Sequence, residues 1–314
     1  MSDLSSLSRS DPYSVPKGHK SGFVAVIGRP NVGKSTLINQ FVGEKVAIVS
    51  SKPQTTRSRI LGILTQETYQ VVFVDTPGIH QPFHRLGRIM VSTATDAIPD
   101  ADLVLFMVDI SVKPTKEDRM IADILERRSD APVILVLNKM DLLTPDEVEA
   151  HTAAYWDLAP FHDEWMMTTA TEGANLDELL ERIIAALPEG PRYYPREYFT
   201  DQTEREIVAE LVREQVLRHT YHEVPHSVAV VVEEFAEREG GAVYIAANVF
   251  VERESQKGII IGRRGRMIRK IGSEARGAVE RLIGGKVYLD LWVKVREDWR
   301  ESGRELRQLG FDRS

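Results

Sequence analysis

The chain has no cysteine among its 314 residues. This excludes disulfide bonds, a thiol nucleophile and a thiolate metal site, and it is compatible with a reducing cytoplasm. Aromatic residues make up only 7% of the sequence, and no apolar stretch is long enough to span a bilayer. The first twenty residues are polar and rich in serine, without the apolar core of a signal peptide, so we expect residues 1–20 to form a disordered tail.

Positive charge is in the minority, because 40 Lys and Arg face 47 Asp and Glu, for a net charge of −7. This balance argues against a protein coated in basic residues for general nucleic-acid binding, although charge is spread unevenly along the chain. The hydrophobic content of 42% and the charged content of 28% are typical of a globular protein. The length predicts about two domains.

A phosphate-binding loop is present at residues 28–35, which read Gly-Arg-Pro-Asn-Val-Gly-Lys-Ser and fit the pattern G-x-x-x-x-G-K-[ST]. Lys34 is placed to reach the β- and γ-phosphate oxygens, and the Ser35 hydroxyl is placed to bind Mg²⁺. The apolar run Phe23–Ile27 predicts a buried strand before the loop, and Thr36–Val42 can start a helix whose N-terminus holds the phosphates. The loop alone does not distinguish ATP from GTP.

The base is indicated by Asn138-Lys-Met-Asp141, which follows the predicted buried strand Val133–Leu137. Ligands bind at the carboxyl ends of strands in such sheets. Asp141 can accept both donors of guanine with its two carboxylate oxygens, and Asn138 can donate to the N7 side. Adenine offers no such donor pair, so the pattern favours GTP over ATP.

A third motif, Asp75-Thr-Pro-Gly78, closes the predicted strand Gln70–Val74. Asp75 suits a water-mediated contact with Mg²⁺, and the Gly78 N–H can meet the γ-phosphate. D-x-P-G is also good turn chemistry, but its position between the two other motifs favours the nucleotide site.

Two further segments complete the predicted site. Gln54-Thr-Thr-Arg57 lies in a polar stretch that we expect to be a mobile loop, with Thr56 as the preferred Mg²⁺ ligand and Thr55 as the alternative. Thr169-Ala-Thr171 follows the segment Trp165–Thr168, and the Ala170 N–H can donate to guanine O6.

With five motifs in this order, the first half resembles a translation-factor-type GTPase, and the wording G-R-P-N-V-G-K-S, Q-T-T-R and D-T-P-G resembles the Era family. The last motif of that family usually begins with Ser, where this chain has Thr169. Because the contact is made by the following backbone N–H, the change leaves the assignment intact. The predicted nucleotide-binding residues are Gly28, Arg29, Pro30, Asn31, Val32, Gly33, Lys34, Ser35, Thr36, Asp75, Thr76, Pro77, Gly78, Ile79, Asn138, Lys139, Met140, Asp141, Thr169, Ala170 and Thr171. The predicted metal ligands are Ser35, Thr56 and Asp75, and the predicted catalytic residues are Lys34, Thr56 and Gly78.

Hydrolysis is expected to be slow. Ras-like enzymes orient the attacking water with a glutamine directly after the D-x-x-G glycine, and this position is Ile79 here. Asn31 matches the asparagine that holds K⁺ in some relatives, so the resemblance implies GTP or GDP and Mg²⁺ as cofactors, with K⁺ as an accelerating ion.

A second domain follows the Pro-rich segment Pro188–Pro195, because three prolines and a glycine in eight residues resist both helix and central strand. Beyond it the pattern predicts a helix over 203–217, strands over 227–234 and 242–252, an amphipathic helix over 267–283, and a half-buried strand over 286–295. A charged terminal helix is expected over 298–307. With Gly262–Gly265 as the loop between two helices, the order α-β-β-α-α-β matches a type II KH domain.

A cluster of cations marks the G-x-x-G loop Gly262-Arg-Arg-Gly265 of that domain. Two glycines allow close approach of a nucleic-acid backbone, and such loops clamp about four nucleotides. No acidic residue interrupts the run of cations. Trp299, with Arg300 and Arg304, is an alternative extension of this surface, against a placement in the core or at its rim. The predicted RNA-binding residues are Gly258, Gly262, Arg263, Arg264, Gly265, Arg266 and Lys270, joined by Arg269.

The predicted fold is an α/β P-loop GTPase domain at residues 21–187, with a mostly parallel sheet and helices on both faces. A linker at 188–196 joins it to an α+β type II KH domain with a C-terminal helix at 197–314. The Era resemblance implies a slow GTPase switch that binds the 3′ end of small-subunit (16S) rRNA and acts in assembly and maturation of the 30S ribosomal subunit. It also implies a monomer in the cytoplasm with a peripheral fraction at the inner membrane. The alternatives are a P-loop ATPase and an RNA chaperone whose GTP site is only structural.

Overall fold

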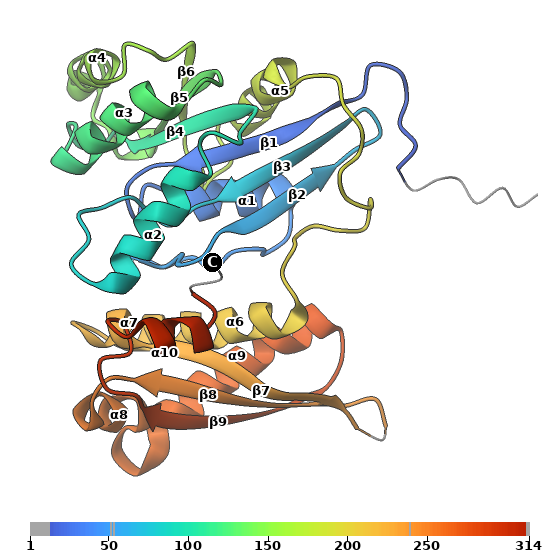
Figure 1. The fold of residues 1–314 in the computed structure, drawn as a ribbon, viewed down its shortest axis with the longest axis vertical. Helices are drawn as coiled ribbons and strands as arrows, with labels where there is room; N and C mark the ends of the chain where they lie inside the picture. The colour runs from blue at the N-terminus through green and yellow to red at the C-terminus, as the bar shows by residue number, and fades with distance from the viewer. Residues whose placement is uncertain (1–12, 51, 53, 239, 312–314) are drawn as a thin grey trace, which may run out of the picture.

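The computed structural model describes residues 13–50, 52, 54–238 and 240–311. Two sheets, one above the other in Figure 1, divide the chain into two domains. The first twelve residues of the expected tail lie outside the described chain. The first domain begins before residue 21, because the first strand starts at Lys20 and His19 is already buried.

The first domain contains a six-stranded sheet with strand order β2-β3-β1-β4-β5-β6, in which only β2 runs antiparallel to its neighbour. Helices cover both of its faces (Figure 1), as the sequence predicted. The strands are β1 (Lys20–Ile27), β2 (Ile60–Thr65), β3 (Tyr69–Asp75), β4 (Leu103–Asp109), β5 (Val133–Asn138) and β6 (Glu164–Thr168). The helices are α1 (Lys34–Val42), α2 (Arg85–Asp96), α3 (Lys116–Arg128), α4 (Val148–Leu158) and α5 (Leu176–Ala186), with the 3₁₀ turns η1 (Met140–Leu142) and η2 (Pro145–Glu147).

The register of the sheet brings the motifs to one edge. The carboxyl end of β3 lies beside that of β1, with Asp75 opposite Val26. Asp109 is opposite Asn138, and Asn138 is opposite Thr168. Every residue of β4 and β5 is buried, because helices pack on both faces of these central strands. The polar residues that end the strands therefore gather at the edge where α/β sheets bind ligands.

The connection between the domains lies against the first sheet. The Gln70 side chain donates to the Tyr194 carbonyl and accepts from the Tyr193 and Tyr194 N–H groups. Further along, the Ile63 N–H donates to the Phe199 carbonyl. The connecting segment thus continues to contact the first domain until α6 begins at Glu204.

The second domain has the predicted order of elements, except that the short helix α7 ends at Ser227, where the strand predicted over 227–234 was expected to begin. Its elements are α6 (Glu204–His219), α7 (Val224–Ser227), β7 (Ala229–Glu237), β8 (Val243–Val251), α8 (Glu254–Ile261), η3 (Arg263–Gly265), α9 (Arg266–Ile283), β9 (Val287–Val295) and α10 (Gly303–Gln308). β7 pairs antiparallel with β8, and β8 pairs parallel with β9. Residues alternate along β9 between the helix-covered face and the exposed face, as predicted. No helix among the described residues is long and apolar enough to cross a membrane.

The terminal helix is shorter than predicted. Residues 297–301 form turns, and α10 begins only at Gly303, with Ser302 as its N-cap. Trp299 explains the difference, because its side chain is fully buried and its indole N–H donates to the Ser227 carbonyl at 2.9 Å. The alternative that Trp299 extends the RNA surface is therefore wrong. Its neighbour Arg300 is also engaged, in an ion pair with Glu252 at 2.5 Å.

Candidate functional site

The loop at residues 28–35 wraps the N-terminus of α1, as the motif predicts. Gly33 has φ 111°, a conformation that favours glycine, and a side chain there would collide with the amide of Asn138. The Asn138 amide in turn donates to the Val32 carbonyl at 2.7 Å. The phosphate-binding loop and the base-recognition motif are thus locked together, although 106 residues separate Val32 from Asn138.

Lys34 is buried beneath this loop. Its ammonium group donates to the carbonyls of Gly28 and Arg29, at 3.0 Å each. Burial lowers the pKa of Lys34 to about 8, although the nearby Asp75 carboxylate opposes this shift. The ammonium group can exchange these carbonyls for phosphate oxygens.

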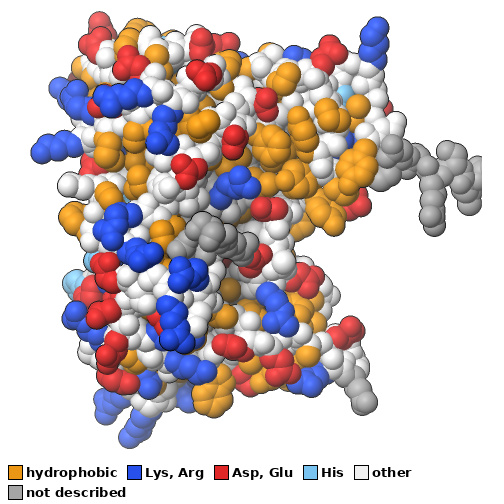
Figure 2. Space-filling model, viewed as in Figure 1, with side chains coloured by type: hydrophobic (Ala, Val, Ile, Leu, Met, Phe, Trp, Pro, Cys, Tyr) orange, Lys and Arg blue, Asp and Glu red, His pale blue; other side chains and the backbone are white. Residues whose placement is uncertain are grey.

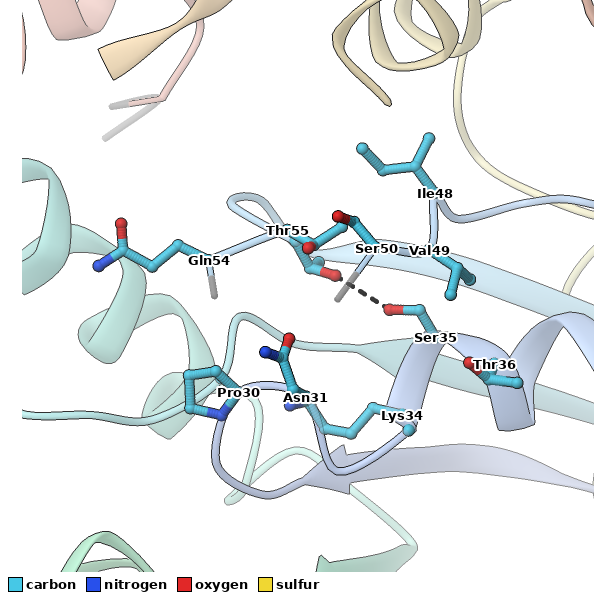
Figure 3. Close-up of a pocket in the computed structure, with 13 residues that line it drawn as sticks. Pro30, Asn31, Lys34, Ser35, Thr36, Ile48, Val49, Ser50, Gln54 and Thr55 are labelled. Atoms are coloured by element: carbon cyan, nitrogen blue, oxygen red, sulfur yellow. Dashed lines mark hydrogen bonds between the residues drawn. The ribbon is translucent and has the colours of Figure 1, made fainter. Parts of the chain in front are cut away.

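The three predicted metal ligands lie together. The Ser35 hydroxyl donates to Asp75 at 2.7 Å and lies 3.0 Å from the Thr56 hydroxyl, the contact drawn as a dashed line in Figure 3. Thr56 also donates to Asp75 at 3.3 Å. The Thr55 hydroxyl instead donates to the Lys52 carbonyl, so the geometry favours Thr56 over the alternative.

The chemistry of this cluster fits Mg²⁺. Asp75 is fully buried, and its Oδ1 atom has no hydrogen-bond partner among the described residues. Burial raises the pKa of this carboxyl, against the effect of Lys34 and the two hydroxyl donors. An unpartnered carboxylate oxygen beside two hydroxyls is an all-oxygen donor set, which is the kind that Mg²⁺ prefers.

In the proposed base-recognition motif, the side-chain oxygen of Asn138 accepts two hydrogen bonds from the protein. The Oδ1 atom accepts from the Ala170 N–H at 2.9 Å and from the Thr168 hydroxyl at 3.1 Å. One amide N–H goes to Val32, which leaves the second for guanine N7. The contact between Ala170 and O6 stays a prediction, because its N–H already donates to Asn138. Asp141 is exposed on η1, where its carboxylate is open to a ligand.

A partly buried ion network connects the two ends of the site. Lys139, held at φ 68°, places its ammonium 2.6 Å from Asp109, and Arg29 lies 3.6 Å from the same carboxylate and 3.4 Å from Asp118. Burial works to raise the pKa of Asp109, but hydrogen bonds from Lys139 and Ser111 bring it below its usual value. Lys139 and Arg29 therefore act as supports for the loops.

The loop that carries Thr56 also contacts the second domain. Arg57 is buried and donates to the carbonyls of Pro225, His226 and Val228 around α7. In the other direction, the Arg213 side chain of α6 donates to the Thr55 carbonyl. These contacts, here called the interdomain contact, flank Thr56 on both sides. Sequence reasoning included Arg57 in a motif but gave it no partner, because the acceptors lie about 170 residues away.

Further contacts extend this interface. Glu214 of α6 pairs with Lys45 at 2.6 Å and accepts from the Val49 N–H at 3.2 Å. On the other side, the Leu86 N–H of α2 donates to the Arg300 carbonyl at 3.0 Å. The loop after α1, which lines the phosphate pocket, and the start of α2 are thus both bonded to the second domain.

The G-x-x-G loop is built as predicted, between α8 and α9. Gly262 has φ 67°, and a side chain there would come within 2.7 Å of Met267. Arg264 has φ 54°, and the Arg269 guanidinium donates to its carbonyl at 2.7 Å. All five predicted cations are exposed, and Figure 2 shows Lys and Arg side chains gathered at the lower left, where α8 lies in Figure 1.

Fold and site together define a class: a P-loop GTPase domain joined to a KH domain. A family described as "50S ribosome-binding GTPase" matches residues 23–139, and the KH domain family matches residues 223–300. Among curated proteins, GTPase Era of Geobacter metallireducens is 52% identical over 93% of this chain and 98% of the relative. GTPase Era of Heliobacterium modesticaldum is 48% identical over 93% of this chain and 97% of that relative.

Solved structures agree. A crystal structure of Era in complex with MgGDPNP and nucleotides 1506–1542 of 16S ribosomal RNA matches with a TM-score of 0.90 and 39% identity, over 93% of this chain and 99% of that one. An Aquifex aeolicus Era variant bound to GDP·AlF₄⁻ matches with a TM-score of 0.87 and 38% identity, over the same shares of the two chains. The chain therefore belongs to the Era family of GTPases.

Proposed function

We propose that this GTPase binds the 3′ end of small-subunit rRNA on its KH domain, and that the nucleotide in its first domain controls this binding during 30S assembly. The main observation behind this proposal is the interdomain contact, because Arg57 and Arg213 attach the segment around Thr56 directly to the KH domain. Thr56 would move towards the phosphates on binding Mg²⁺, and the contacts of Arg57 and Arg213 would transmit this movement to α7 and α6.

The pocket supports the site residues proposed for GTP. Lys34 would meet the β- and γ-phosphates, while Ser35, Thr56 and Asp75 would hold Mg²⁺. The ion supplies charge neutralisation between the phosphates when it is bound. Asp141 and Asn138 would select guanine. Asn31, which lines the phosphate pocket, is the residue we propose as a K⁺ ligand.

The RNA partner is proposed from two observations. The cations of the G-x-x-G loop are exposed and uninterrupted by acidic residues, and a relative is solved with 16S rRNA nucleotides 1506–1542. KH surfaces bind single strands, so we propose an unpaired 3′ segment as the ligand. A monomeric state, a cytoplasmic location and a peripheral membrane fraction are predictions from the family resemblance alone.

The test is RNA binding by the full chain loaded with GDPNP and Mg²⁺, and separately with GDP. A single-stranded RNA with the 3′-terminal sequence of 16S rRNA should bind more tightly to the GDPNP form, and a scrambled RNA of the same length should bind weakly to both. Equal affinity for the two RNAs would reject the proposed partner. Equal affinity of the two nucleotide forms would instead support the RNA chaperone with a structural GTP site.

A further inference from the structure

The residue after Gly78 cannot orient the attacking water. Ile79 is fully buried and packs in the same apolar cluster as Ile27 and Phe106, so its side chain points into the core. A different polar group must therefore take the role that a glutamine has at this position in Ras-like enzymes. This group has to line the phosphate pocket.

Most polar side chains of the pocket already have a function in the proposed site. Lys34 is assigned to the phosphates, Ser35 and Thr56 to Mg²⁺, and Asn31 to a monovalent cation. The Thr55 hydroxyl is held by the Lys52 carbonyl. Gln54 lines the same pocket and is assigned to none of these contacts. Figure 3 shows it at one end of the pocket, on the side of Pro30, with its amide directed away from Lys34, Ser35 and Thr36.

Gln54 is held in place by His80. The Gln54 Nε2 atom lies 3.0 Å from His80 Nε2, and His80 Nδ1 lies 2.9 Å from the Gly78 carbonyl. The carbonyl can only accept, so Nδ1 carries the proton and Nε2 accepts from the Gln54 amide. His80 thus links Gln54 to Gly78, which itself lies directly against Pro30 with no room for a side chain.

The backbone at this position is also unusual. Gln54 has φ 60°, a left-handed conformation that costs a non-glycine residue free energy. Such outliers gather at functional sites, where the surrounding structure holds them. The hydrogen bond to His80 leaves the second amide N–H and the Oε1 atom of Gln54 without a partner among the described residues.

We propose that Gln54 positions the attacking water, and that His80 is the positioning residue that holds Gln54. Oε1 accepts a hydrogen bond from the water, and the second amide N–H donates to a γ-phosphate oxygen. The water oxygen bonds to the γ-phosphorus as the bond from phosphorus to the β–γ bridging oxygen breaks. The electron pair of that bond leaves with GDP, and a water proton passes to the phosphate product. This inference rests on the proposed nucleotide site.

Single-turnover hydrolysis of GTP by Gln54→Ala tests the proposal, because it separates chemistry from product release. We expect the rate to fall about tenfold or more, with the affinity for a fluorescent GDP analogue unchanged within about twofold. His80→Ala should lower the rate less, and the double variant should be no slower than Gln54→Ala, since the two act as a unit. Gln66→Ala is the matched control, because Gln66 is exposed in the β2–β3 turn at the far end of the sheet.

A Gln54→Ala rate within twofold of wild type would overturn the proposal. So would additive losses in the double variant, or a loss of nucleotide affinity as large as the loss of rate, because either would indicate a purely structural role. Failure of the wild-type chain to bind the GDP analogue would instead reject the proposed nucleotide site itself.

Discussion

The nucleotide pocket and the G-x-x-G loop use polar residues in opposite ways. In the pocket, Lys34 and Asp75 are buried and bonded to the protein, ready to exchange those partners for phosphate and metal. In the loop, Arg263 and Arg264 are exposed, and the backbone is shaped by glycines. The first arrangement holds one small ligand in a fixed geometry, whereas the second attracts a flexible polyanion. Changes in the two regions should therefore have separable effects.

The largest separable effect is expected in the loop. Replacing Arg263 and Arg264 together with Asp places carboxylates where phosphates should lie and removes favourable counterion release. We expect affinity for the single-stranded rRNA 3′ end to fall about a hundredfold or more, measured by gel shift at fixed salt. Basal GTP hydrolysis should stay near wild type. Surviving RNA affinity would place the RNA site elsewhere, and lost hydrolysis would show that this loop also supports the GTP site in the absence of RNA.

The corresponding change in the pocket is Asp141→Asn. Loss of the paired, charged contact to guanine should weaken GTP binding at least tenfold, by roughly 1.5–3 kcal/mol. Xanthosine triphosphate should gain affinity, because the new amide can donate where the carboxylate only accepts. Competition against a fluorescent guanine nucleotide measures both effects. Unchanged GTP affinity would remove the guanine assignment, and RNA binding by the nucleotide-free variant should match wild type.

The buried state of Lys34 predicts a pH dependence that the exposed cations should not share. With a pKa of about 8 in the nucleotide-free protein, Lys34 loses its charge as the pH rises above 8, and nucleotide binding must restore the proton. GTP affinity should therefore be constant below pH 8 and fall by about tenfold per pH unit above it. Titration calorimetry at pH 8.5 in buffers of different ionisation enthalpy should show proton uptake. Binding without proton uptake would show that Lys34 is already charged.

The smallest effect concerns the proposed cation. If Asn31 holds K⁺ beside the phosphates, hydrolysis should be several-fold faster in KCl than in NaCl of equal ionic strength, since a fixed positive charge stabilises the transition state. Asn31→Ala should remove the difference and leave the slower rate. Equal wild-type rates in the two salts would reject the cation site, whereas the other pocket assignments would stand.

The sequence predicted the loops of both proposed sites and their places in the fold because their determinants are local. The phosphate loop, the Asn138–Asp141 motif and the Gly262–Gly265 loop each depend on a few adjacent residues, and strand periodicity placed them correctly. The sequence pattern could not identify hydrogen-bond partners that are distant in the chain. Trp299 looked like part of a charged helix because its acceptor, Ser227, lies 72 residues away. Gln54 lies before β2 and His80 lies after β3, and the antiparallel pairing of these two strands brings their segments together.

The interdomain contact is the part of the molecule where the two regions meet, and it was also invisible in the sequence. Arg57 directly follows the predicted Mg²⁺ ligand Thr56, yet all three of its carbonyl acceptors belong to the KH domain. Two ligand sites joined by such a contact form a switch only if the contact has two arrangements that the nucleotide can bias.

The most direct test of this switch is rRNA 3′-end affinity in the GDPNP and GDP forms of the wild type and of Arg57→Ala. The wild-type ratio should be at least about fivefold in favour of GDPNP, and in Arg57→Ala it should approach one while nucleotide affinity is retained. Arg59→Ala is the matched control, because Arg59 is an exposed arginine two residues along the same segment, and its ratio should match wild type. A wild-type ratio near one, or an Arg57→Ala ratio equal to that of the wild type, would contradict the claim that the nucleotide controls RNA binding through this contact.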